Sequence, residues 1–220
     1  DDSNTFDDIS SKNQYTISIL DLDNYKWKGI FKNNLFDYQL FHHNSFLDSE
    51  DQNLYFFGGY GDFKFYNNLR SYSFTDNQLK DLNIIGDEIN PRFYSALKYT
   101  KNKKLLLYGG SGNQTGEGSL GKQFYYDFYN LDFSRSKDTV FSQRIWTNNI
   151  EGSSESFNAE TLSLTDDKRS FFVSTYSDTN DNGFVKLKKI EIENGVEKYV
   201  GDSILVNTSR LANKVNFYRS

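Results

Sequence analysis

The chain has 220 residues and a formal net charge of −5; hydrophobic residues make up 36% of it and charged residues 25%. This balance excludes a disordered acidic chain, and no window approaches the roughly 18 consecutive apolar residues of a membrane-spanning helix, so membrane insertion is not expected. Lysine and arginine are scattered, so the basic face that phosphate neutralisation needs is missing and nucleic acid is not expected as a partner.

Aromatic residues make up 17% of the chain, with 16 tyrosines and 20 phenylalanines against a single proline, which favours β-strands. Cysteine is absent, which excludes disulfides and thiolate zinc sites. Methionine is absent even at position 1, which predicts a portion of a longer protein, and the first ten residues have no features of a signal peptide.

The predicted strands follow one another along the chain with polar turns between them. A first strand at 18–23 precedes Trp27. Two groups of four strands follow, at 39–47, 53–57, 65–74 and 79–84, and then at 93–99, 104–108, 124–133 and 140–146. A last pair lies at 169–175 and 183–193. Four strands joined by short turns predict an antiparallel meander.

The two groups contain the same internal pattern. Residues 53–59 read NLYFFGG and residues 104–110 read KLLLYGG, so that the second glycines lie 51 positions apart. This spacing is typical of one four-stranded propeller blade, about 50 residues long. A glycine pair at the end of a strand is expected where the backbone needs a positive φ or a close approach.

These residues resemble the kelch-repeat family of β-propellers, of the type seen in the central domain of galactose oxidase. The apolar run ending at Gly110 is followed by the aromatic strand 129–132, which ends in Asp132, and by Trp146, while Pro91-Arg92 stands where a kelch blade often opens. The resemblance implies an all-β fold, with blades of four-stranded antiparallel meanders in a partial or small propeller over 15–206. Segments 1–14 and 207–220 would flank it. A β-sandwich with two accidental glycine pairs is the alternative.

The number of predicted blades bears on whether the chain associates with itself. The sequence accounts for about three blades and part of another, fewer than the six or seven of a usual kelch ring. An open arc would expose sheet edges, so self-association through blade edges is expected.

Several motifs for chemistry were weighed. Residues 116–121 read G-x-G-x-x-G, but a strand-like run follows instead of a helix, so phosphate binding is not expected. Asp178, Asn180 and Asn182 match the first half of a calcium loop; the twelfth position is Lys189, and a hairpin turn is the competing interpretation. His42 and His43 point to opposite faces of a strand and are not expected to chelate one metal.

Copper chemistry of the galactose oxidase type needs a cysteine, which this chain lacks. We therefore expect no enzyme activity and no cofactor, and we expect binding through loops that the strands hold in place. The candidate binding residues lie in three loops: Tyr60, Asp62 and Lys64; Arg92 and Tyr94; Gln114 and Glu117.

Two functions remain open. The first is a protein-interaction or sensory module within a larger protein, and the alternative is a carbohydrate-binding or carbohydrate-active propeller. Aromatic residues gathered at the loop end would favour a glycan, whereas a flat apolar patch flanked by arginine would favour a protein. The sequence does not fix the compartment, although a location outside the cytoplasm is favoured.

Overall fold

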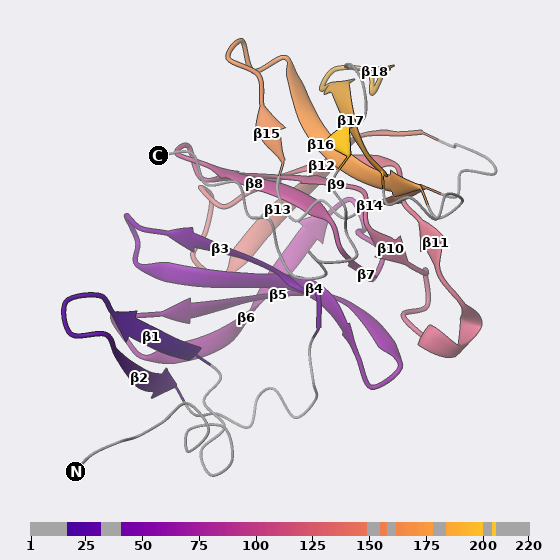
Figure 1. Cartoon of the computed structure of the whole chain (residues 1–220). Coiled ribbons are helices and arrows are strands. Elements are labelled where there is room, and N and C mark those ends of the chain that lie inside the picture. Colours follow the sequence, from indigo (N-terminus) through magenta and orange to yellow (C-terminus); the bar gives the residue numbers. More distant parts are fainter. Residues whose placement is uncertain are drawn as a thin grey trace. The chain divides into compact units, whose positions relative to one another are not determined.

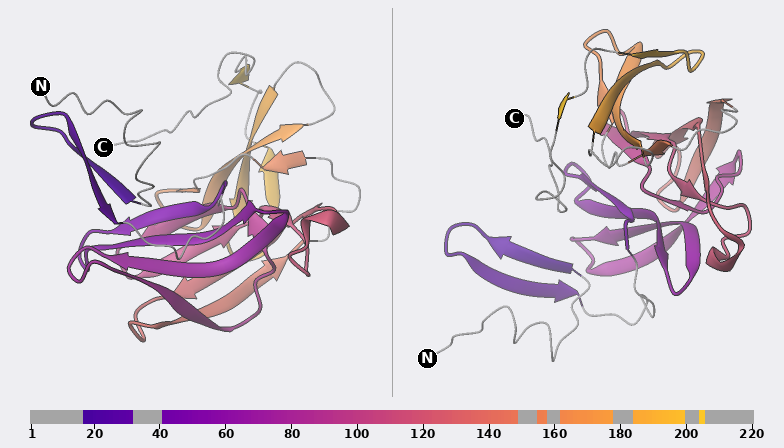
Figure 2. Two further views of the ribbon diagram at one scale, coloured as in Figure 1. Left: turned by 90° about the horizontal axis from the view of Figure 1, so that it is seen from below. Right: turned by 45° about the vertical axis from the view of Figure 1, so that its right-hand side comes forward.

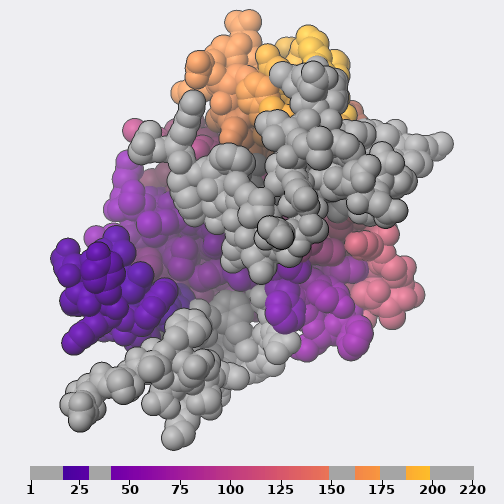
Figure 3. Space-filling model, in the orientation of Figure 1, coloured from indigo at the N-terminus to yellow at the C-terminus, as the bar shows by residue number. Residues whose placement is uncertain are grey.

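The computed structural model describes six stretches of the chain, which are the parts drawn in colour in Figures 1 and 3. These stretches are residues 17–31, 41–148, 155–157, 162–177, 184–199 and 204–205. The chain divides into two compact units, Asp1–Leu40 and Phe41–Ser220. The predicted flanking segments 1–14 and 207–220 lie outside the described residues.

The first unit contains one antiparallel hairpin, formed by β1 (Ile17–Asp21) and β2 (Lys26–Phe31). Its turn is held by the side chain of Asp21, whose carboxylate accepts a hydrogen bond of 2.9 Å from the backbone N–H of Asp23. Tyr25 completes the turn with a φ of 56°. The hairpin matches the strand that the sequence predicted before Trp27.

The second unit begins with two four-stranded antiparallel meanders. The first consists of β3 (Asn44–Asp48), β4 (Asn53–Gly61), β5 (Lys64–Ser73) and β6 (Gln78–Gly86). The second consists of β8 (Ala96–Thr100), β9 (Lys104–Tyr108), β12 (Asp127–Asp132) and β13 (Thr139–Thr147).

A small three-stranded sheet continues the second meander at one end. It is formed by β7 (Arg92–Phe93), β10 (Ser111–Gly112) and β11 (Gln123–Phe124), with β10 in the middle. A single 3₁₀ turn, η1 (Gly118–Leu120), lies in the loop before β11. The predicted strands 93–99 and 124–133 are thus each broken in two, the first of them at Tyr94, which has a φ of 55°.

The C-terminal strands, orange to yellow in Figure 2, form a third sheet in which the central strands follow one another in chain order. Its first position is shared by β14 (Glu155–Phe157) and β15 (Ser163–Leu164), which both pair with β16 (Ser170–Ser177). Next comes β17 (Phe184–Glu191), which pairs with β16 and with β18 (Glu197–Tyr199) and β19 (Ile204–Leu205). The all-β class predicted from the sequence is therefore confirmed in the described residues.

One pairing departs from the predicted pattern of purely antiparallel blades. Strands β6 and β13 run parallel, with Asn83 opposite Thr139 and Gly86 opposite Ser142, and so join the two meanders into one eight-stranded mixed sheet. The backbones come very close here, because a Cβ on Gly86 would lie 2.2 Å from the carbonyl oxygen of Ser142. Such a junction pairs segments more than 50 positions apart, and no local sequence pattern signals it.

The two end strands of this sheet, β3 and β8, face each other, so that the sheet nearly closes. The rings of Phe46 and Tyr99 stack with centroids 5.0 Å apart, and the Tyr99 hydroxyl donates a 2.7 Å hydrogen bond to Asp48. At the start of β3, the side-chain amide of Asn44 donates a 2.8 Å hydrogen bond to the carbonyl of Ser95, the residue before β8. Side chains therefore link these two edges.

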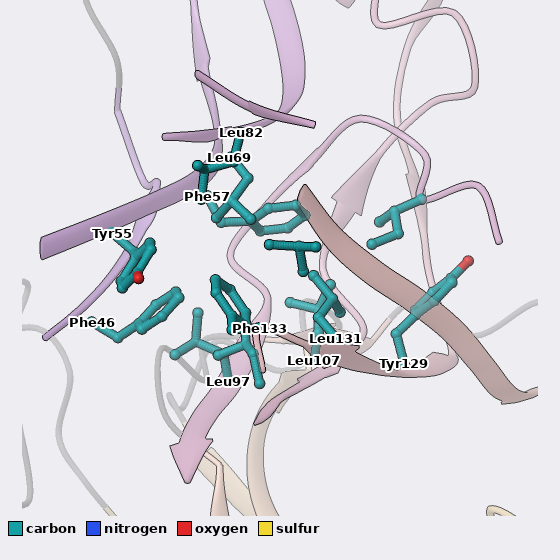
Figure 4. Close-up of a cluster of buried hydrophobic side chains, with 13 residues drawn as sticks. Phe46, Tyr55, Phe57, Leu69, Leu82, Leu97, Leu107, Tyr129, Leu131 and Phe133 are labelled. Atoms are coloured by element: carbon teal, nitrogen blue, oxygen red, sulfur yellow. The ribbon is translucent and has the colours of Figure 1, made fainter. Parts of the chain in front are cut away.

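Two hydrophobic cores hold the second unit together. The first lies between the two meanders and includes Phe57 and Leu69 from one and Leu107 and Leu131 from the other (Figure 4). The second core combines the opposite face of the second meander with the third sheet, where the rings of Phe128 and Phe171 stack at 5.0 Å. The second meander is thus covered on both faces. No described segment is a helix long and apolar enough to cross a membrane.

The buried tyrosines predict a loss of stability in alkali. Burial is the largest cause that raises the pKa of Tyr99 and Tyr108 above their usual value and that of Tyr129 to about 12. The hydroxyl groups of these tyrosines lose their protons near pH 10 in the unfolded chain but not in the folded chain. Their contribution to the free energy of unfolding is therefore present below pH 10 and is lost as the pH rises above it.

We expect the free energy of unfolding, measured by urea denaturation, to be level at about pH 8 and to fall between about pH 10 and pH 11. The limiting slope is about 1.4 kcal/mol per pH unit for each such tyrosine. Tyr129→Phe should reduce this slope by about 1.4 kcal/mol per pH unit, the contribution of one tyrosine. A stability that stays level to pH 11 would contradict the assignment.

Candidate binding surface at the loop end

The hairpin between β4 and β5 carries an exposed phenylalanine at its tip. Gly61 pairs with Lys64, so the turn consists of Asp62 and Phe63 alone. Both residues have a positive φ, 48° and 59°, as in a type I′ turn, where Asn-Gly is the preferred pair because a bulky residue in this conformation is strained. Phe63 nevertheless occupies the second position with 77% of its surface exposed.

Aromatic rings gather next to this tip, from β4, β5, β7 and the segments before β3 and β8. We call this group the loop-end aromatic cluster; it comprises Phe41, His42, Tyr60, Phe65, Phe93 and Tyr94. Phe93 is at its centre, stacked on Phe65 with centroids 5.5 Å apart and 5.9 Å from the centroid of Tyr60.

The outer side of the cluster is partly exposed. The Tyr94 hydroxyl lies 3.1 Å from Nε2 of His42, and the two rings are 4.1 Å apart. Phe41 is 49% exposed and is held by two backbone hydrogen bonds to Tyr60, of 2.7 and 2.8 Å. The cluster therefore has a rigid base and a solvent-facing aromatic edge.

The long loop of the second meander folds onto the first. The N–H of Gly118 donates to the carbonyl of Phe63 at 2.6 Å, and the N–H of Phe65 donates to the carbonyl of Gly116 at 2.7 Å. Lys64 and Glu117 form an exposed ion pair of 3.8 Å. The G-x-G-x-x-G segment thus supports the hairpin tip, and a strand follows it, as the sequence indicated.

The predicted binding residues separate into two groups. Tyr60 and Tyr94 both contact Phe93, and Lys64 contacts Glu117, so four of the seven come together at the loop end. Asp62 is exposed in the same hairpin turn, and Gln114 is exposed in the long loop. The seventh candidate, Arg92, lies elsewhere.

Arg92 was expected on the exposed loop end, and this expectation is wrong, because the residue is 0% exposed. Its guanidinium pairs with both carboxylate oxygens of Asp127, at 2.6 and 2.9 Å, and donates to the carbonyls of Gly109 and Asn90 at 3.0 and 2.9 Å. Burial lowers the pKa of Arg92, but the carboxylate of Asp127 more than reverses this effect. The pair joins β7, the end of β9 and the start of β12.

A pocket of about 350 Å³ lies beside this ion pair, at the end of the second meander. We call it the tyrosine pocket. Its aromatic lining consists of Phe124, Tyr125, Tyr126 and Tyr129. Its polar lining consists of Asn90, Gln123, Asp127, Arg144, Thr147 and Asn148. The guanidinium of Arg92 lies 4.2 Å from the centroid of the Tyr125 ring and so fixes one wall.

The sequence contains one signal for this site, Asp127. Asp127 lies within the run 124–129, in which all the remaining residues are phenylalanine or tyrosine. An acidic residue in such a strand needs a buried cation or another partner. That requirement predicts a basic partner near the core, and the structure supplies it as Arg92.

The calcium candidates Asp178, Asn180 and Asn182 lie outside the described residues. Within the described ranges, no group of three histidine, aspartate or glutamate side chains is placed to hold a metal ion. His42 and His43 take separate surroundings, His42 against Tyr94 and His43 with its ring centroid 5.7 Å from that of Phe56.

The geometry defines an all-β protein built from successive four-stranded meanders, with loops gathered at one end of the first two. Searches against models of known protein families and against curated proteins find no match to this chain. The function is therefore argued from the two sites alone.

Proposed function

We propose that this chain is a non-catalytic protein-interaction module of kelch-like β-propeller type, and that the loop-end aromatic cluster together with Phe63 is its recognition surface. The architecture is supported by three successive meanders of the same strand order. It is also supported by the two glycine pairs, in which Gly58 and Gly109 have φ values of 64° and 65° and Gly59 and Gly110 have values of 115° and 106°. The two glycine pairs therefore have closely similar φ angles.

The strained and exposed Phe63 carries the proposal for the site. A bulky residue in the left-handed region costs about 1–2 kcal/mol, and an exposed phenylalanine contributes little to folding. A residue that lowers stability and faces solvent is expected where a partner uses it. Phenylalanine offers a large apolar surface without a hydrogen-bonding group, which suits an apolar pocket on a protein partner.

The test is a selection of peptides from a displayed random peptide library on the immobilised chain, followed by affinity measurements on the variant Phe63→Gly. We expect this variant to bind the selected peptides at least 30-fold more weakly, because a hot-spot aromatic contributes about 2 kcal/mol or more. We also expect its free energy of unfolding to rise by about 1 kcal/mol, because glycine relieves the strained turn.

The matched control is Leu47→Ser, which removes an exposed apolar side chain at the far end of β3 from His42. It should leave peptide affinity unchanged. Peptides that bind Phe63→Gly as tightly as the wild type would overturn the proposal, as would a library that yields no peptide dependent on the loop end.

A further inference from the structure

We propose that the tyrosine pocket is a second binding site and that it takes a saccharide residue. The lining of this site shares no residue with the loop-end surface, although Phe124 and Phe93 both lie opposite Ser111 in the same small sheet. A saccharide would then bind in this pocket, and a protein partner would bind at the loop end. The inference rests on the charge of the pocket, on its polar groups and on one buried hydroxyl.

Outside one internal ion pair the pocket carries a single charge, which is too little to favour a multiply charged phosphorylated ligand. Of its two charged lining residues, Asp127 is neutralised by the bidentate pair with Arg92. The second, Arg144, lies 5.5 Å from the centroid of the Tyr129 ring and is exposed at the rim. A neutral polar ligand, one side of which can contact Arg144, fits this balance better than a polyanion.

The remaining polar groups are side-chain amides and a hydroxyl. Asn90, Gln123 and Asn148 each have both a donor and an acceptor, and Thr147 adds a hydroxyl that can act as either. The amide of Asn148 is oriented by its 2.8 Å hydrogen bond to the carbonyl of Gly195. Groups that both donate and accept are the natural partners of vicinal sugar hydroxyls.

The aromatic wall complements the other surface of a sugar. Phe124 is half-buried and faces the pocket, with Gln123 exposed next to it. The C–H face of a pyranose ring is apolar and packs on such rings, while its hydroxyls point to the amides. This division between an apolar wall and a few convergent polar groups is typical of small-molecule sites.

Tyr125 supplies the most specific observation. It is only 6% exposed, and its hydroxyl has no hydrogen-bond partner among the described residues. A buried hydroxyl without a partner lowers stability and calls for an explanation. A ligand hydroxyl that reaches it past the exposed Gln123 would provide the missing bond.

The experiment uses the full chain with free D-glucose, D-galactose, D-mannose and N-acetyl-D-glucosamine and with oligosaccharides of each. Binding is measured by saturation-transfer NMR and titration calorimetry. We expect at least one saccharide to bind, and we expect Tyr125→Phe and Gln123→Ala each to weaken it at least tenfold. Gln143→Ala makes the same change at an exposed position of β13 outside the pocket and should leave the affinity unchanged.

Thermal stability separates a ligand-binding hydroxyl from a structural one. Without ligand, Tyr125→Phe should melt at the same temperature as the wild type or about 2–4 °C higher, because the unpaired hydroxyl is removed. A lower melting temperature, equal effects of Gln123→Ala and Gln143→Ala, or no binding of any saccharide would each overturn the proposal.

The two proposals can fail separately. We expect Phe63→Gly to alter only peptide binding and Gln123→Ala to alter only saccharide binding. Saccharide binding that is lost in Phe63→Gly and kept in Gln123→Ala would assign the sugar to the loop end and refute the pocket.

Discussion

Replacing Arg92 by alanine should lower the free energy of unfolding by about 3–5 kcal/mol, the effect expected when one partner of a buried ion pair is removed. The side chain is fully buried, and its four hydrogen bonds tie together three segments of the second meander. Its loss leaves the carboxylate of Asp127 buried without a partner. The guanidinium that covers the Tyr125 ring is lost as well.

The matched control is Lys80→Ala, which removes an exposed ion pair between Lys80 and Asp138. Exposed pairs contribute about 0–1 kcal/mol, so this variant should be nearly as stable as the wild type. Urea denaturation followed by far-ultraviolet circular dichroism measures both. A loss below about 1 kcal/mol in Arg92→Ala would contradict the buried pair.

A second variant keeps the test informative if Arg92→Ala does not fold. The double replacement Arg92→Met with Asp127→Leu removes both charges and fills their volume with apolar groups. It should fold and be more stable than either single alanine variant, because no charge remains uncompensated. A double variant as unstable as Arg92→Ala would show that the hydrogen bonds to Gly109 and Asn90, rather than the charge balance, carry the stability.

Arg92 also illustrates where prediction from the sequence ended. The sequence places Pro91-Arg92 at the start of a repeat and predicts Arg92 as a binding residue in a loop. Exposure depends on whether an opposite charge comes within reach in the fold, and Asp127 lies 35 positions away. The position of the strand could be read locally, but the partner of the side chain could not.

The same division holds for the fold as a whole. Strand positions followed from apolar runs and turns, because these depend on neighbours in the sequence, and both glycine pairs have the predicted positive φ. The parallel pairing of β6 with β13 and the broken strands around Tyr94 and Tyr125 depend on contacts between distant segments. Of the loop-end aromatic cluster, only Tyr60 and Tyr94 were among the predicted residues, and Phe63 was not. The lining of the tyrosine pocket was not predicted as a site, because distant segments form it.

The glycine pairs lead to the second large expected effect. Gly110→Ala should lower the free energy of unfolding by about 2–5 kcal/mol, the sum of a backbone cost of about 1–2 kcal/mol and an overpacking cost of about 1–3 kcal/mol. Gly110 has a φ of 106°, and a Cβ there would lie 2.6 Å from the hydroxyl oxygen of Ser95 and 2.9 Å from the carbonyl oxygen of Phe93. The Phe93 oxygen belongs to the paired backbone of β7 and β10 and cannot move aside cheaply.

Gly121→Ala isolates the backbone part of this cost. Gly121 has a φ of 82°, but nothing lies within 4 Å of a Cβ placed on it. Its ψ is −176°, so the backbone lies in a region that is essentially reserved for glycine, and its replacement should cost only this backbone strain, about 1–3 kcal/mol. The difference between the two variants in urea denaturation measures the close approach at Gly110. Equal losses would mean that the glycine pair is required for its backbone conformation alone, and that the packing of β7 against the end of β9 tolerates a methyl group.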